Sequence, residues 1–255
     1  MKDWAGTGEA FAASYAQLCL GTADLLIARL GPAQERSVLD VGAGTGDLAA
    51  RFVEAGWNTA GCEPESSMRV VAKREHPGIP IRDGTLPDLP FPDAAFDAVT
   101  ANFVLNHVAD PRASAAEMGR VSAGQLAATI WSRSPSWFWL EVCESAGLAP
   151  AAGARLPAEK DFERTAGGFA AMLSDAGWRD VHVDEQAWTW HADPAVLWAS
   201  AEGGVASAGA FYAALREDER HRFRAGFDAV CERRGVDGGI PLEHVAAVAV
   251  GRRRA

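Results

Sequence analysis

From residue 37 onward, short apolar runs alternate with segments whose apolar residues recur at helical spacing. The apolar runs are SVLDVGA (37–43), NTAGCEP (58–64), IPIRDG (79–84), FDAVTANF (96–103) and QLAATIWS (125–132), and the helical patterns between them are DLAARFVEAG (47–56), SSMRVVAKREHP (66–77) and DPRASAAEMGRVSA (110–123). Strands that alternate with helices predict a parallel sheet. Runs of successive apolar residues are typical of strands covered by helices on both faces. The pattern predicts a doubly wound α/β fold.

Two further apolar runs, DVHVDEQAWTW (180–190) and EHVAAVAVGRR (243–253), predict the last two of seven strands. About fifty residues of mostly helical pattern separate them, which is too long for a structureless loop. We therefore expect a helical insertion at about 194–234 that folds over the sheet as a cap. We expect one domain over 1–255, with a core made of 36–133, 178–191 and 243–253. Within the N-terminal 1–35, EAFAASYAQL (9–18) and TADLLIARL (22–30) predict two amphipathic helices.

Charge and cysteine usage exclude several classes of partner. The formal net charge of −10 weighs against nucleic acid, because proteins that bind it usually carry a concentrated basic face. Cys19, Cys62, Cys143 and Cys231 lie far apart without a CxxC pair, so we expect no metal site and no disulfide framework. No window reaches the ~18 uninterrupted apolar residues that a membrane helix requires. We expect a cytoplasmic protein with no membrane partner.

The stretch VLDVGAGTGDLA (38–49) places three glycines between a predicted strand and a predicted helix. Glycine accepts positive φ and lets a ligand approach the backbone, so such a loop can hold a cofactor at the carboxyl end of the sheet. Gly42, Gly44 and Gly46 are spaced G-x-G-x-G, whereas dinucleotide-binding folds use G-x-G-x-x-G. Asp40 at the strand end would repel a pyrophosphate and suits a ligand with a cationic amino group. Both features disfavour a nicotinamide-dependent oxidoreductase.

The segment LDVGAGTG resembles motif I of the class I S-adenosylmethionine-dependent methyltransferases. EPESSMRVVAKR is similar to the second motif of that family, and DGTLPDLPFPDAAFDAVTANFVLNHVADP (83–111) to its GDA-x-x-LPF-x-x-x-x-FD segment. The close match spans residues 37–132. It implies a Rossmann-like fold with an antiparallel final strand, and S-adenosylmethionine as cofactor with S-adenosylhomocysteine as product. Within the family, the chain looks most like small-molecule methyltransferases of bacterial specialised metabolism.

The resemblance also assigns cofactor contacts residue by residue. Asp40 and the glycine loop would hold the methionine half of S-adenosylmethionine. Glu63, 17 residues past Gly46, would accept hydrogen bonds from the ribose hydroxyls. Met68 takes the position that packs against adenine. The acid that usually pairs with the adenine amino group falls on Thr85, with Asp83 two residues earlier, and the two remain alternatives. The further contacts that the resemblance implies are Ala43, Pro64, Gly84, Leu86, Asn102 and Phe103.

Candidate residues for catalysis and acceptor binding follow the fourth and fifth predicted strands. His107 lies just past the fourth, where the methyl group should point, and could take the proton that an alcohol or phenol loses on reaction. Its alternative role is a structural hydrogen bond. Seven of the nine tryptophans follow residue 130. Trp131 and Trp137 are predicted to bind a flat aromatic or polycyclic acceptor, and the alternative is that they pack the cap onto the sheet.

Two rival functions share the predicted fold. A nucleic-acid methyltransferase is disfavoured because ANFVLN at the fourth strand lacks an Asn/Asp-Pro-Pro-aromatic motif and no cysteine follows a proline. A relative that binds S-adenosylmethionine without transferring its methyl group is not excluded by any residue. The sequence therefore predicts a transferase that methylates O, N or C of a small-molecule acceptor and functions as a monomer or homodimer.

Overall fold

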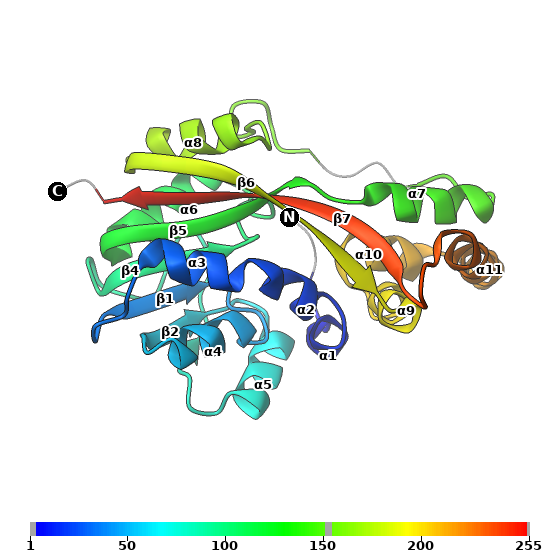
Figure 1. The fold of residues 1–255 in the computed structure, drawn as a ribbon, viewed down its shortest axis with the longest axis horizontal. Helices are drawn as coiled ribbons and strands as arrows, with labels where there is room; N and C mark the ends of the chain where they lie inside the picture. Colours follow the sequence, from blue (N-terminus) through cyan, green and yellow to red (C-terminus); the bar gives the residue numbers. More distant parts are fainter. Residues whose placement is uncertain (1–3, 151–154, 254–255) are drawn as a thin grey trace.

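Seven strands form one sheet in the order β3-β2-β1-β4-β5-β7-β6 (Figure 1). The computed structural model describes residues 4–150 and 155–253. The strands from β3 to β5 pair in parallel, and β7 pairs antiparallel with both β5 and β6. The sheet confirms the predicted fold, including its antiparallel final strand. The strands are β1 (Ser37–Val41), β2 (Asn58–Cys62), β3 (Ile81–Arg82), β4 (Phe96–Asn102), β5 (Ser122–Arg133), β6 (Arg179–Ala192) and β7 (Ile240–Arg252).

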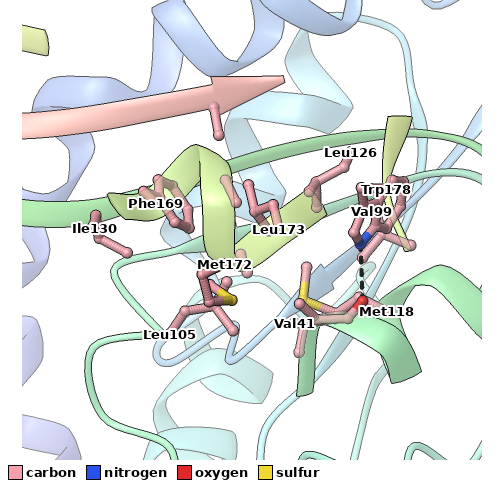
Figure 2. Packing of buried hydrophobic residues seen from close by; sticks show 14 of the residues in the cluster. Val41, Val99, Leu105, Met118, Leu126, Ile130, Phe169, Met172, Leu173 and Trp178 are labelled. Atoms are coloured by element: carbon pink, nitrogen blue, oxygen red, sulfur yellow. Dashed lines mark hydrogen bonds between the residues drawn. The ribbon is translucent and has the colours of Figure 1, made fainter. Parts of the chain in front are cut away.

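Helices cover both faces of the sheet, because alternate residues of each strand point to opposite sides. On one face, α3 (Ala23–Leu30) and α4 (Asp47–Glu54) pack in a core cluster that includes Ala98 of β4. On the other face, α6 (Pro111–Val121) and α8 (Ala166–Asp175) pack with Val99 of the same strand (Figure 2). Asp110 caps α6, since its carboxylate accepts a hydrogen bond from the backbone N–H of Ala113.

A helical cap stands at the carboxyl end of β5 (Figure 1). Three of its helices follow β6 and precede β7 in the sequence: α9 (Pro194–Glu202), α10 (Ala206–Ala214) and α11 (Glu217–Arg234). They share a buried cluster with α7 (Ser136–Ser145), a helix that the sequence analysis did not assign to the cap. Strands β6 and β7 stay paired as far as Ala192 and Ile240, so the sheet itself extends into the cap.

The N-terminal segment departs from the expected pattern. One helix is predicted over EAFAASYAQL, but the structure has two short ones, α1 (Gly8–Ala12) and α2 (Tyr15–Cys19), followed by the 3₁₀ helix η1 (Leu20–Thr22). The break lies at Ser14, whose hydroxyl donates to the Ala10 carbonyl while its backbone N–H donates to Phe11. A side-chain donor has replaced the helical backbone donor. The break turns α1 toward α5 (Ser66–Glu75) and the cap helix α9.

Candidate cofactor site

The glycine loop joins β1 to α4 at the carboxyl edge of the sheet. Gly42, Gly44 and Gly46 have φ values of +70°, +55° and +87°, a region that L side chains rarely adopt. The backbone N–H groups of Gly42 and Ala43 donate to the carbonyl of Cys62, which ties the loop to the end of β2. A Cβ at Gly42 would lie 2.5 Å from Val104, whereas one at Gly44 would meet only the Phe11 ring at 3.6 Å. The loop is therefore tightly packed at Gly42, whereas at Gly44 it has room for a Cβ in contact with the Phe11 ring.

Asp40, near the end of β1, carries a buried carboxylate. It is 1% exposed, and neither of its oxygens accepts a hydrogen bond from the described residues. Burial, together with the nearby carboxylates of Glu63 and Asp47, raises the pKa of Asp40 to about 8. A buried polar group left unpaired costs free energy. The arrangement suits a cationic group that would supply the missing donors.

Glu63 follows β2 directly and contacts the glycine loop. It is 7% exposed, and its two carboxylate oxygens accept hydrogen bonds from the backbone N–H groups of Gly44 and Glu65, each at 2.9 Å. Burial raises the pKa of Glu63, against the lowering effect of these two donors. Asp40, Asp47 and Glu63 thus place three carboxyl groups around one loop. This electrostatic environment fits the ammonium and sulfonium groups of S-adenosylmethionine.

The predicted adenine contacts lie around α5 and the loop after β3. Met68 is buried on α5. Gly84 is held by close packing, since a Cβ there would lie 2.5 Å from Pro90. The Asp83 carboxylate is engaged by Arg69, whose two terminal nitrogens lie 3.2 and 3.1 Å from its oxygens. The same guanidinium donates to the Glu63 and Pro64 carbonyls.

The hydroxyl of Thr85 has only a long hydrogen bond, 3.4 Å, to the carbonyl of Leu86 among the described contacts. Asp83 is thus paired with Arg69, and both Thr85 and Asp83 remain candidates for the contact with adenine. The assignment stays a prediction.

Asn102 and Phe103, at the end of β4, use their side chains within the protein. The Asn102 side-chain oxygen accepts hydrogen bonds from the hydroxyls of Thr22 and Thr129, and its nitrogen donates to the Cys19 carbonyl. The Phe103 ring stacks on Trp131 with 3.7 Å between ring centroids and 6° between planes. Asn102 therefore fastens the N-terminal helices to the sheet. Any contact of these two residues with a cofactor stays a prediction.

The two tryptophans predicted to bind the acceptor lie in different places. Trp131 belongs to an aromatic stack with Phe103 and Trp188. Trp137 lies on α7 in the cap, is 38% exposed, and has the Arg234 guanidinium 5.4 Å from its ring centroid. No described contact joins Trp137 to the glycine loop, so its predicted role gains no geometric support.

His107 lies in the turn after β4. Its backbone N–H donates to the Val104 carbonyl, and its ring meets Trp4 edge to face at 5.8 Å between centroids. The neighbouring Asn106 accepts from the backbone N–H of Trp131 at 2.8 Å and donates to its carbonyl at 3.4 Å. Asn106 thus anchors this turn to β5 and holds His107 at the carboxyl edge of the sheet.

Sequence reasoning missed three residues near the site: Asn106, Trp4 and Phe11. Asn106 lies within the segment that resembles the family, but only its pairing with β5 identifies its role. Trp4 and Phe11 come from a segment whose pattern indicated only helix packing. Their nearness to His107 and Gly44 depends on how α1 folds back.

No three His, Cys, Asp or Glu side chains within 4–150 and 155–253 gather as metal ligands. In the same ranges, none of the helices is both long and apolar enough to cross a membrane.

The family model described as "Methyltransferase domain" matches residues 39–126. The chain is 32% identical over 160 residues to a demethylmenaquinone methyltransferase of Paenarthrobacter aurescens, covering 57% of this chain and 63% of that protein. It is 35% identical over 176 residues to the one of Beutenbergia cavernae, covering 63% and 71% respectively. Among solved structures, the YcgJ protein from Bacillus subtilis has the same fold, with a TM-score of 0.59, 19% identity, and coverage of 92% of this chain and 99% of that one.

Proposed function

Because the chain belongs to the class I S-adenosylmethionine-dependent methyltransferases, we propose that it binds S-adenosylmethionine at the glycine loop and methylates a small aromatic acceptor. The observation that carries the proposal is the buried carboxylate of Asp40, which has no hydrogen-bond partner in the part of the chain that the structure describes and lies near Glu63, the partner of Gly44. When bound, the cofactor supplies an electrophilic methyl group on a cationic sulfur. The proposal places the enzyme in the cytoplasm.

The residues of this chain would act mainly by binding and orientation. Asp40 would hold the cationic amino group and Glu63 the ribose hydroxyls. Gly44, which has no side chain, would let the backbone lie against the methionine half. Orientation of two reactants in one site can supply up to about 7–11 kcal/mol of the barrier. His107, held by the Asn106 anchor, would take the proton of a hydroxyl acceptor.

The proposed acceptor is aromatic and electron-rich. The relatives described above are named demethylmenaquinone methyltransferases, which motivates a quinone-derived ring as the first acceptor to test. A methyl group leaves a sulfonium as an electrophile, so the reduced, electron-rich hydroquinone form is the chemically competent nucleophile. Hydroxylated polycyclic aromatics form the second group of acceptors to test.

Calorimetric titration with S-adenosylmethionine and, separately, with S-adenosylhomocysteine tests the cofactor site. We expect binding of both at micromolar strength. Binding of neither would overturn the proposal. Formation of S-adenosylhomocysteine with reduced demethylmenaquinone or a polycyclic phenol then tests the activity. Cofactor binding without product across both groups of acceptors would instead favour a relative that retains the cofactor and does not transfer methyl.

His107→Ala should lower the turnover rate about 10²-fold or more with a hydroxyl acceptor, because proton removal then loses its base. Cofactor affinity should stay within about threefold of wild type, since the histidine acts on the acceptor. Steady-state rates at saturating cofactor check this. An unchanged rate would show that the acceptor atom needs no base or that another group removes the proton. As a matched control, His221→Ala changes a histidine of α11 in the cap and should leave the rate unaltered.

A further inference from the structure

Residues 4–14, here called the N-terminal strap, pass over the carboxyl edge of the sheet between α5 and the cap. The backbone N–H of Gly8 donates to the Ser67 hydroxyl at 3.1 Å, and that of Gly6 to the Glu65 carboxylate at 3.3 Å. A Cβ at Gly8 would lie 2.4 Å from the Ser67 carbonyl oxygen, so the strap lies flat on α5. On its other side, Ala10 packs closely on Gly203 at the end of α9.

The strap places an aromatic ring against the glycine loop at Gly44. The side chain nearest to a Cβ built at Gly44 is that of Phe11. Its ring carbon Cε1 would lie 3.6 Å from that Cβ, an ordinary van der Waals distance. Phe11 is partly exposed and belongs to none of the three buried core clusters. Its ring therefore lies against the site and contributes little to the packing of the sheet.

A second ring connects the strap to the turn after β4. Trp4 meets Phe11 edge to face at 6.1 Å and His107 edge to face at 5.8 Å between ring centroids. Phe11, Trp4 and His107 thus form a continuous row of rings from the glycine loop to the candidate base. The row spans the ends of β1 and β4, where the proposed methyl transfer takes place.

We propose that Phe11 and Trp4 complete the methyl-transfer site. Phe11 packs against the methionine half of bound S-adenosylmethionine, and Trp4, together with His107, forms the wall against which a flat aromatic acceptor binds. Aromatic rings suit both tasks, because their faces attract a cationic group and offer broad apolar contact to another ring. The inference rests on the proposed function and names the acceptor-binding residues of that same site.

The Phe11 part is tested without turnover, by titration with S-adenosylhomocysteine. Phe11→Ala should weaken binding about tenfold or more through lost apolar contact, and Phe11→Leu should recover most of the affinity. Phe211→Ala, which removes an equally large ring from α10 in the cap, should leave the affinity unchanged. Thermal melts of the ligand-free variants show that each is folded.

Hydrogen exchange supplies a second readout of the strap. The Gly6 and Gly8 amides bond to side chains of the loop before α5 and of α5 itself, so they exchange only when the strap opens. S-adenosylhomocysteine should slow exchange of residues 4–14 in the wild type, and Phe11→Ala should lose that slowing.

The Trp4 part is tested with the acceptor that gives product among the reduced demethylmenaquinone and polycyclic phenol groups. Trp4→Ala should raise the KM for the acceptor about tenfold while the Kd for S-adenosylhomocysteine stays within about twofold. Trp4→Phe should restore most of the acceptor KM.

The outcomes separate this inference from the proposed function. If the wild type binds no S-adenosylhomocysteine, the proposed function fails and the inference falls with it. If the wild type binds it and Phe11→Ala binds equally well, with no slowing of exchange in the strap, the inference is wrong and the proposed function stands. An unchanged KM for the acceptor in Trp4→Ala would likewise overturn the proposal that Trp4 and His107 form the wall against which the acceptor binds.

Discussion

Gly44→Val is expected to lower the affinity for S-adenosylmethionine at least about 100-fold while the protein stays folded. The valine side chain would lie on the side of the glycine loop where the backbone is proposed to contact the cofactor. Its Cβ meets no atom closer than the Phe11 ring at 3.6 Å, so the fold has room for a Cβ at this position. The positive φ of +55° adds strain of about 1–2 kcal/mol, which a domain of ordinary stability tolerates.

Gly147→Val is the matched control for backbone strain. Gly147 has a φ of +64°, and a Cβ there would meet its nearest atom, on Arg222, at 3.8 Å. It lies after α7 in the cap. Calorimetric titration and a thermal melt of both variants separate the two effects. If Gly44→Val retains micromolar affinity for S-adenosylmethionine, the assignment of the glycine loop is wrong. If Gly147→Val loses a similar amount of affinity, the loss in Gly44→Val is due to backbone strain.

Asp40→Asn is expected to weaken cofactor binding about 100-fold and to raise the melting temperature of the ligand-free protein. The carboxylate is buried and has no hydrogen-bond partner within 4–150 and 155–253, so its ionisation costs the folded protein free energy. The same charge would pair with the cofactor's amino group, an interaction whose loss typically costs 2–5 kcal/mol. An amide of the same shape removes both effects. Opposite changes in stability and affinity are the result that a purely structural aspartate would not produce.

The pH dependence follows from the raised pKa of Asp40. Its pKa rises from an ordinary value of 3.8 to about 8, so between these values the folded protein binds more protons than the unfolded chain. Ligand-free stability should therefore fall as pH rises through this window. Pairing with a cation ionises the group, so binding near pH 7 should release a proton, and affinity should rise up to about tenfold per pH unit between pH 6 and 7.5.

Titrations in buffers of different ionisation enthalpy count the released protons. Wild type should release up to one proton near pH 7, and Asp40→Asn should release none. Asp228→Asn alters an exposed acid that pairs with Arg224 on α11 and should behave as wild type. A wild-type affinity that does not change with pH would show that Asp40 is already ionised or does not meet the cofactor.

The core of the fold could be predicted because its signals are local. Each parallel strand is a short apolar run, and each crossover helix carries its own periodicity and cap, as Asp110 and Pro111 show for α6. The glycine loop could also be located, since strand, glycines and helix are contiguous in the sequence. The break at Ser14 could not, because the same residues fit one amphipathic helix, and the contact of α1 with α5, such as Gly8 to Ser67, joins parts of the chain that are far apart in the sequence.

The sequence by itself determined the alternation of strands and helices, the glycine loop with Asp40, and the resemblance that places Glu63 beside it, because all of these depend on residues close together in the chain. Only the tertiary structure decided which side chains meet across long separations. It placed α7 in the cap and paired Asp83 with Arg69. The Asn102 side chain bonds to both the N-terminal segment and β5. The folded chain also brings Phe11 close to Gly44 and Trp4 close to His107. Such contacts depend on the path of the folded chain, and no periodicity or spacing encodes them.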